Sequence, residues 1–168
     1  QVAAALGARV VATAGGPERV ARCAQLGADV VVDHRAGDVV AEVLAATDGR
    51  GVDVVLDVLG GRALAENVGL LATGGRLEVI GLQHGRRGEL DLSALMARRA
   101  SVHGATLLAR PLAEKAEIVA QVGRHVWPMV AEGRVRPVVH DRIPLEEGRR
   151  AHELLESGAV FGKLVLTT

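Results

Sequence analysis

Aromatic side chains are nearly absent from this sequence of 168 residues, which contains one Trp, one Phe and no Tyr. Proteins that hold single-stranded nucleic acid stack its bases on aromatic rings, so a stacking platform of that kind is excluded. An excess of one charge is absent as well, because 20 Lys and Arg stand against 20 Asp and Glu. Nucleic acid and acidic membrane surfaces attract proteins through a basic excess, so neither is expected as a partner.

Cysteine, metal-ligand clusters and long apolar runs are also scarce. Cys23 stands alone, which excludes a disulfide framework and a zinc site built from thiolates of this chain. The six histidines show no metal-ligand spacing, so no metal site is predicted. No apolar run approaches the ~20 residues of a membrane-spanning helix and no signal peptide is visible, so we expect a cytoplasmic protein without a membrane partner.

Hydrophobic residues make up 49% of the chain, which is enough for a globular core. In the first half, short β-branched runs alternate with segments of helical periodicity. The predicted strands are residues 8–14, 30–33, 52–57 and 76–81. The predicted helices are residues 17–26, 39–46 with Asp38 as the cap, and 63–71, after which Gly74 and Gly75 form a turn. Apolar strands that alternate with helices are typical of a parallel sheet with helices on both faces, so the fold class is predicted to be α/β, doubly wound.

The second half of the chain and its first residues have a different pattern. The predicted helices are residues 92–98, 112–132 and 145–157, and the predicted strands are residues 101–107, 138–143 and 163–167. Pro137 marks a change of pattern, so we place a domain boundary after residue 136. At the other end, the chain opens at Gln1 with what resembles the last turns of a helix closed by Gly7, so we expect further sequence upstream.

Glycines gather where the predicted strands end. Parallel sheets bind ligands at the carboxyl ends of their strands, where Gly15, Gly16, Gly60 and Gly81 allow close backbone approach. Each of these glycines alone is typical of an ordinary turn. Together they favour a ligand site.

The first predicted strand, residues 8–14, ends without an acidic residue. In dinucleotide-binding sheets a carboxylate there holds the ribose of NAD, whereas NADP needs cations for its 2′-phosphate. Arg19 and Arg22 follow on the next helix, where a guanidinium could bind phosphate. Spacing alone equally allows a solvated helix face with Glu18 as the partner. His34 follows a strand end at the same edge of the sheet.

A series of motifs runs through the whole chain. In order they are residues 6–15 (LGARVVATAG), 25–29 (QLGAD), 49–57 (GRGVDVVLD), 74–77 (GGRL), 104–110 (GATLLAR) and 162–166 (GKLVL). Together they resemble the zinc-free, zeta-crystallin-like quinone oxidoreductases of the medium-chain dehydrogenase/reductase superfamily. The motif at 104–110 is more similar to this branch than to the alcohol dehydrogenases.

The resemblance implies an NADPH-dependent reductase that passes a hydride to a quinone or to the β-carbon of an α,β-unsaturated carbonyl (an enone). Arg19 matches the family's basic residue for the 2′-phosphate, Gly16 replaces a small polar residue, and His34 replaces a tyrosine. Together with the strand-end glycines, the predicted cofactor contacts are Gly15, Gly16, Arg19, His34, Gly60, Gly81, Leu82, Gln83 and Lys163. No general acid is expected within this chain.

The family pattern also contains parts that this sequence does not carry. The resemblance places a catalytic domain, the first Rossmann strand and the pyrophosphate loop before Gln1. Residues 1–136 would then be an incomplete nucleotide-binding domain, and residues 137–168 a segment that returns to the catalytic domain. The missing strand would lie between residues 8–14 and 52–57. We expect these two strands either to pair directly or to leave an unpaired edge each.

The predicted strand of residues 101–107, which begins at Ser101 and ends at Leu107, has an open edge. The resemblance implies a homodimer through that strand. Two alternatives to the reductase remain open. One is an enoyl reductase module of a multidomain synthase, and the other is a non-catalytic dimerisation and partial cofactor-binding fragment.

Overall fold

In the computed structural model, which describes residues 1–168, the chain divides into two units. One unit comprises Val10–Ala120, and the other comprises Gln1–Arg9 with Gln121–Thr168. Every strand in both units runs parallel to its partner. None of the helices combines the length and the apolarity that crossing a bilayer would require.

The Val10–Ala120 unit alternates strands with helices as the sequence predicts. Its elements are β1 (Val11–Ala14), α2 (Pro17–Gln25), β2 (Val30–Asp33), α3 (Val39–Ala46), β3 (Val52–Asp57), η1 (Gly61–Ala63), α4 (Leu64–Gly69), β4 (Leu71–Val79), α5 (Leu92–Arg98), β5 (Ser101–Gly104) and the greater part of α6 (Leu112–His125). The predicted cap of α3 is confirmed, because a carboxylate oxygen of Asp38 accepts a hydrogen bond from the N–H of Ala41 at 3.1 Å.

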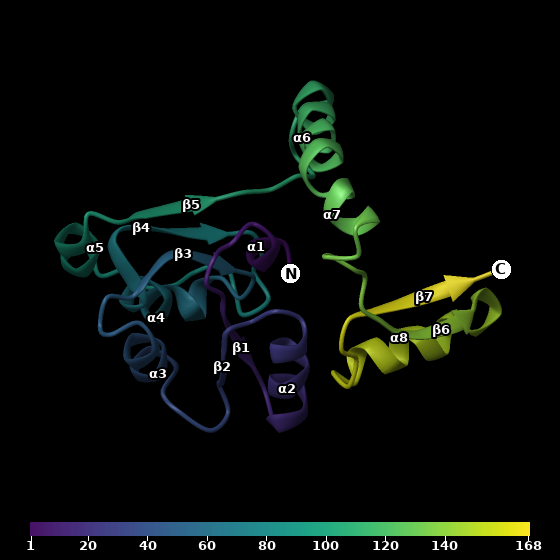
Figure 1. Ribbon diagram of the computed structural model, residues 1–168, viewed down its shortest axis with the longest axis horizontal. Coiled ribbons are helices and arrows are strands. Elements are labelled where there is room, and N and C mark those ends of the chain that lie inside the picture. Colours follow the sequence, from purple (N-terminus) through teal and green to yellow (C-terminus); the bar gives the residue numbers. More distant parts are fainter. The chain divides into compact units, whose positions relative to one another are not determined.

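The strands of this unit form two parallel sheets (Figure 1). β1 pairs with β2, while β3, β4 and β5 form a second sheet in that order. No hydrogen bonds join β1 to β3, so the direct-pairing alternative is wrong and each of these strands keeps one edge without a strand partner. The observed class is α/β with parallel strands.

Two clusters of buried apolar side chains form the core of this unit. Val39 and Val43 of α3 pack with Val32 of β2 in one cluster, and Val68 and Leu77 belong to a second cluster. The half-buried Val55 of β3 contacts both clusters, so it links the cores of the two sheets. On β3, by contrast, Val54 and Leu56 are 43% and 67% exposed. The alternation of strand side chains places them on the face opposite Val55.

The predicted turn at Gly74 and Gly75 is wrong. β4 already begins at Leu71, which pairs with Val52, and after a register shift Arg76 pairs with Val54. The glycines therefore lie in an irregular segment inside the strand. Gly74 has φ +77°, and a Cβ on Gly75 would lie 2.9 Å from the carbonyl oxygen of Ala72, so this bulge needs glycine. The helix before it also ends early, at Gly69.

Two predicted elements of the later chain are shorter than expected. The strand of residues 101–107 ends at Gly104. The helix of residues 112–132 is divided into α6 and α7 (Trp127–Ala131), separated at Val126. Pro128 explains this break, because its ring nitrogen has no hydrogen to donate to a carbonyl of the preceding turn.

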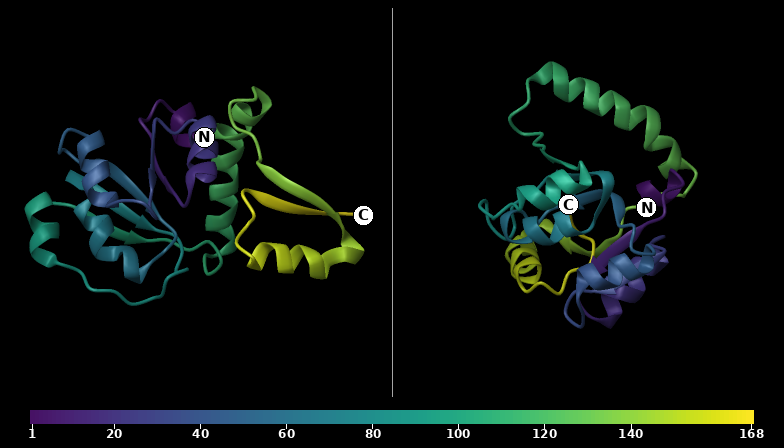
Figure 2. Two further views of the ribbon diagram at one scale, coloured as in Figure 1. Left: turned by 90° about the horizontal axis from the view of Figure 1, so that it is seen from below. Right: turned by 90° about the vertical axis from the view of Figure 1, so that its left-hand side faces the viewer.

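The other unit contains the C-terminal strands. Its elements are α1 (Val2–Ala5), the end of α6, α7, β6 (Val139–Pro144), η2 (Leu145–Glu147), α8 (Gly148–Glu156) and β7 (Lys163–Thr167). β6 and β7 pair in parallel, and α8 connects them and runs alongside (Figure 2). Ile143 is fully buried in this unit. The side chain of Gln1 exchanges two hydrogen bonds of 3.0 Å with the backbone of Arg136.

Candidate cofactor site

The corner after β1 and β2 is held together by one carboxylate. Oδ1 of Asp33 accepts hydrogen bonds from the N–H groups of Gly16 and Arg35, both at 3.0 Å. These two donors hold the pKa of Asp33 below its ordinary value. Gly16 has φ +89°, a conformation that favours glycine, and α2 begins at the next residue. One carboxylate oxygen of Asp33 is therefore engaged by two backbone N–H groups.

Gly15 is buried at the same corner and lies against the side chains of Arg35 and His34. A Cβ at Gly15 would lie 2.7 Å from Nε of Arg35 and 2.9 Å from Nε2 of His34. The missing side chain is what allows both groups to lie against this backbone. The structure therefore brings together the predicted residues Gly15, Gly16 and His34.

Arg35 is a residue that the sequence analysis missed. It follows His34 directly, but nothing in the local pattern shows that its guanidinium folds back over Gly15. The predicted Arg19 lies on the first turn of α2 and is half-buried. Arg22 forms an ion pair with Glu18 at 3.9 Å, as the solvated-face interpretation predicts for that residue. We call Arg19, His34 and Arg35 with Gly15 and Gly16 the cationic corner.

The loop after β3 is organised by a second carboxylate that the sequence analysis did not single out. Asp57 is 4% exposed, and its two oxygens accept hydrogen bonds from the N–H groups of Leu59 at 3.1 Å and Gly60 at 2.7 Å. An acidic residue that ends a strand and precedes glycine by three positions is typical of a side chain that orders the following turn. That spacing could have identified Asp57.

The predicted residues Gly60 and Gly81 lie where the loop after β3 meets the loop after β4. A Cβ on Gly60 would lie 2.6 Å from the carbonyl oxygen of Gly85, and one on Gly81 would lie 2.7 Å from that of Val58. Close packing of the two loops therefore explains why both positions are glycine, and their contact with a cofactor stays a prediction. Next to them, Leu82 is 58% exposed.

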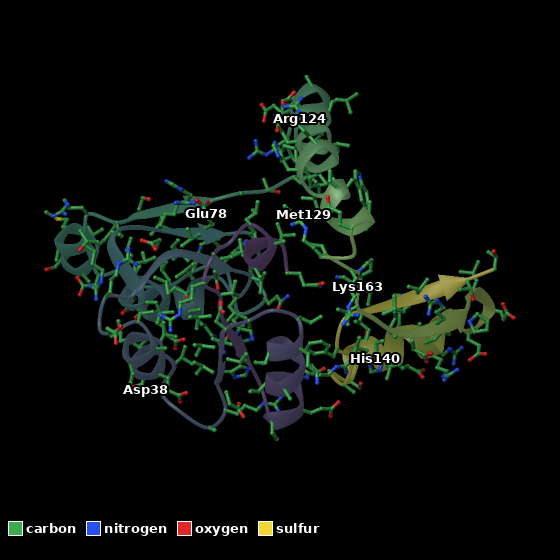
Figure 3. All side chains as sticks on the ribbon, viewed as in Figure 1. Asp38, Glu78, Arg124, Met129, His140 and Lys163 are labelled. Carbon is green, nitrogen blue, oxygen red and sulfur yellow. The ribbon has the colours of Figure 1, made fainter.

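The predicted residues Gln83 and Lys163 are both exposed. The backbone N–H of Gln83 donates to the carbonyl oxygen of Val58 at 3.1 Å, which fixes the loop and leaves the side chain to solvent. Lys163, labelled in Figure 3, is the first residue of β7. Its backbone N–H donates to the carbonyl oxygen of Val138 at 2.8 Å. Lys163 belongs to the C-terminal unit, whereas the other predicted contacts all belong to Val10–Ala120. No group of three or more His, Cys, Asp or Glu side chains is placed to hold a metal ion.

Comparison with known proteins identifies the family. The family described as "Zinc-binding dehydrogenase" matches residues 26–166. The chain belongs to this family. The predicted resemblance to the quinone oxidoreductases of the medium-chain dehydrogenase/reductase superfamily is confirmed by relatives at about 30% identity.

Three relatives illustrate the similarity. Rattus norvegicus quinone oxidoreductase is 30% identical over 171 residues, covering 99% of this chain and 49% of that protein. A phenolphthiocerol/phthiocerol polyketide synthase polypeptide of Mycobacterium tuberculosis is 34% identical over 167 residues, covering 99% of this chain and 8% of the synthase polypeptide. The crystal structure of Escherichia coli quinone oxidoreductase complexed with NADPH has a TM-score of 0.84 at 26% identity, covering 99% of this chain and 51% of that one. The chain thus spans about half the length of the quinone oxidoreductases that it matches.

Proposed function

We propose that this chain forms the cofactor-binding part of an NADPH-dependent reductase that transfers a hydride to a quinone or to the β-carbon of an enone. The family membership supports a nicotinamide cofactor, and the similarity to quinone oxidoreductases supports the substrate class. The parallel α/β unit of Val10–Ala120 supports the same assignment, because Rossmann-type sheets bind dinucleotides at the carboxyl ends of their strands.

The observation that carries the choice of NADPH is the cationic corner. NAD requires a carboxylate that is available to the ribose hydroxyls, but both hydrogen bonds found at Oδ1 of Asp33 come from backbone N–H groups. The guanidinium of Arg35 and the imidazole of His34 lie against Gly15 instead. Such a donor set fits a 2′-phosphate, since guanidinium and phosphate form strong charge-assisted hydrogen bonds.

In this proposal the nicotinamide ring supplies the hydride when the cofactor is bound. The residues of this chain bind and orient the cofactor: Arg19, His34 and Arg35 hold the 2′-phosphate, while the loops at Gly60 and Gly81–Gln83 line its adenosine and nicotinamide parts. A further parallel strand between β1 and β3, with its pyrophosphate loop, completes the sheet. The unpaired edges of β1 and β3 support that assignment.

The test is a titration of the protein that carries this chain with NADPH and with NADH. Arg35→Gln should weaken NADPH binding about tenfold or more, because a hydrogen bond to a charged group contributes ~1.5–3 kcal/mol. NADH binding should change less than about threefold. Arg22→Gln, on α2 and in an ion pair with Glu18, is the matched control and should leave both affinities unchanged. Equal affinity of the unmodified protein for NADPH and NADH would overturn the choice of cofactor.

A second candidate is an enoyl reductase module of a multidomain synthase. The 34% identity to the polyketide synthase polypeptide, over 99% of this chain, favours it specifically. Both candidates use the same cofactor, so the substrate separates them. Reduction of a 2-enoyl pantetheine thioester without reduction of a quinone would favour the synthase module. NADPH binding without reduction of either substrate would favour the third alternative, a non-catalytic cofactor-binding fragment.

We further propose a homodimer through β5. This strand lies at the end of the sheet and pairs only with β4, so its other edge carries unpaired backbone groups. Pairing with β5 of a second copy would extend the sheet across both protomers. The cytoplasmic location stays a prediction.

A further inference from the structure

An open pocket with a volume of about 460 Å³ lies at the loop after β4, outside the cationic corner. It is lined by Arg62, Gln83, His84, Gly85, Arg86 and Arg87. Three of these residues are arginines, a fourth is histidine, and none is acidic. We call this the arginine pocket. Arg62 comes from η1 and the other residues come from the loop between β4 and α5.

The backbone beneath the arginine pocket is fixed by contacts between two loops. The N–H of Gly61 donates to the carbonyl oxygen of Gly85 at 2.7 Å, and the N–H of His84 donates to that of Leu59 at 2.7 Å. A Cβ on Gly61 would overlap the carbonyl group of Arg87, so glycine is required for this approach. Arg62 is thereby held beside Arg87, although the two residues are distant in sequence.

No acid of the chain lies within ion-pair distance of the arginine side chains of the pocket. Some arginines elsewhere in the chain pair with acids, as Arg50 does with Asp53 and Arg110 does with Glu114. Arg62, Arg86 and Arg87 form neither a hydrogen bond nor an ion pair through their side chains. Three like charges around one hollow repel each other, and an anion bound between them would relieve that repulsion.

We propose that Arg62, Arg86 and Arg87, with His84, form a binding site for a phosphate or diphosphate group. The anion site stands on the pocket alone, whereas the source of its phosphate rests on the proposed function. One source is a substrate that carries phosphate, such as a phosphopantetheine thioester. The other is a phosphate of the dinucleotide itself. This site is separate from the cationic corner, which lies after β1 and β2.

The first experiment uses inorganic pyrophosphate and the full chain. Calorimetric titration at about 50 mM salt should show saturable binding, which the double variant Arg86→Gln/Arg87→Gln weakens about tenfold or more. Arg62→Gln alone should weaken it severalfold and serves if the double variant does not fold. Arg50→Gln removes the same charge at the other end of β3 and should leave binding within about twofold. Absence of saturable binding, or equal loss in the Arg50 control, would overturn the proposal.

The second experiment identifies the source. If a substrate supplies the phosphate, the double variant weakens 4′-phosphopantetheine binding about tenfold and leaves NADPH binding within about twofold. If the cofactor supplies the phosphate, the double variant weakens NADPH binding about tenfold and leaves 4′-phosphopantetheine binding within about twofold. If neither ligand is affected, both proposed sources of the phosphate are wrong, and the pyrophosphate titration alone decides whether the anion site exists. Pyrophosphate binding is measured without a dinucleotide, so failure of the NADPH assignment is distinguishable from failure of the anion site.

Discussion

The two loop corners at the carboxyl ends of the strands use glycine for different purposes. In the cationic corner a Cβ on Gly15 would meet the ends of two side chains, those of His34 and Arg35. In the corner after β3 and β4 a Cβ on Gly60 or Gly61 would meet the backbone of the opposite loop. Side-chain ends can move by rotation, but backbone carbonyls cannot move without shifting the loop. The first corner is therefore adjustable around a ligand, whereas the second is a fixed frame.

The two sheets that carry these corners also differ in rigidity, because the β3–β4–β5 sheet is larger and has a more deeply buried core than the β1–β2 sheet. Leu77 of β4 is 0% exposed and lies in the middle strand of the larger sheet, where Leu71 and Val68 complete its cluster. The β1–β2 sheet has only two strands, and Val32 of β2 is its most buried side chain. Isolated two-stranded sheets are marginal in stability, so β1 and β2 depend on the packing that they share with α3.

The largest effect is expected when the core of the larger sheet is opened. Leu77→Ala should lower the free energy of unfolding by about 2–5 kcal/mol, through lost burial and the cavity that remains. Val32→Ala removes less side chain and should cost about 1.6 kcal/mol from burial alone. Urea unfolding measures both. Leu108→Ala, at a side chain that is 87% exposed, is the control and should stay within about 0.5 kcal/mol. A larger loss for Val32→Ala than for Leu77→Ala would reverse the ranking of the two sheets.

The comparison of the corners is sharpened by placing alanine at the two kinds of glycine. Gly61→Ala forces a Cβ against the backbone of Arg87 and should cost about 1–3 kcal/mol of stability, as overpacking does. Gly15→Ala displaces only the ends of Arg35 and His34. Its free energy of unfolding should fall by less than about 1 kcal/mol, while NADPH affinity falls because the guanidinium of Arg35 and the imidazole of His34 are displaced.

Urea unfolding and NADPH titration of both variants make this test. If Gly15→Ala is the more destabilising variant, the cationic corner is as rigid as the other one. If Gly15→Ala leaves NADPH affinity unchanged, the contact between Gly15 and its two side chains has no part in binding the cofactor.

Sequence patterns predicted the local elements of this fold well, because each depends on residues close together in the chain. The bounds of β3 and β7 agree with the prediction, and so does the Asp38 cap. The glycines of β4 were misinterpreted, because a strand bulge and a turn both favour positive φ and small side chains. Whether these glycines form a turn or a bulge depends on the pairing of Leu71 with Val52 on β3, and local sequence does not show that pairing.

The candidate site was predictable only in part, for the same reason. Gly16 and His34 follow strand ends, so their place at one edge follows from the parallel topology. The fold of Arg35 over Gly15 depends on a side chain meeting a backbone about 20 positions away, and the pairing of the loops at Gly61 and Gly85 is also long-range. The arginine pocket forms because the loops at Gly61 and Gly85 meet. Local sequence shows only that the second loop is rich in Gly and Arg, not that it meets Arg62.

A smaller effect is expected at the free edge of the larger sheet. The N–H of Ala105 donates to Val79 of β4 at 3.0 Å, so alternation along the strand directs the N–H of Val102 outward. Val102→Pro removes this outward donor and should weaken the proposed dimer about tenfold. Val102→Ala loses similar packing but keeps the N–H, so it is the matched control. Analytical ultracentrifugation of both variants gives the dissociation constants, and an unchanged dimer in Val102→Pro would show that β5 is not the interface.

The smallest effect is expected from the carboxylate of the cationic corner. The N–H groups of Gly16 and Arg35 lower the pKa of Asp33 in the folded state, so its contribution to stability is complete above the ordinary value of 3.8. That contribution is lost as the pH falls through the lower pKa of the folded state, where Asp33 takes up a proton. Asp33→Asn should therefore be less stable than the unmodified protein at pH 7, and the difference should shrink towards pH 3. Urea unfolding across this range measures it, with Asp48→Asn as a control for loss of one negative charge. A difference that stays constant from pH 7 to pH 3 would show that the charge of Asp33 does not contribute to stability. The hydrogen bonds from Gly16 and Arg35 would then stabilise the corner no more when the carboxylate is ionised than when it is protonated.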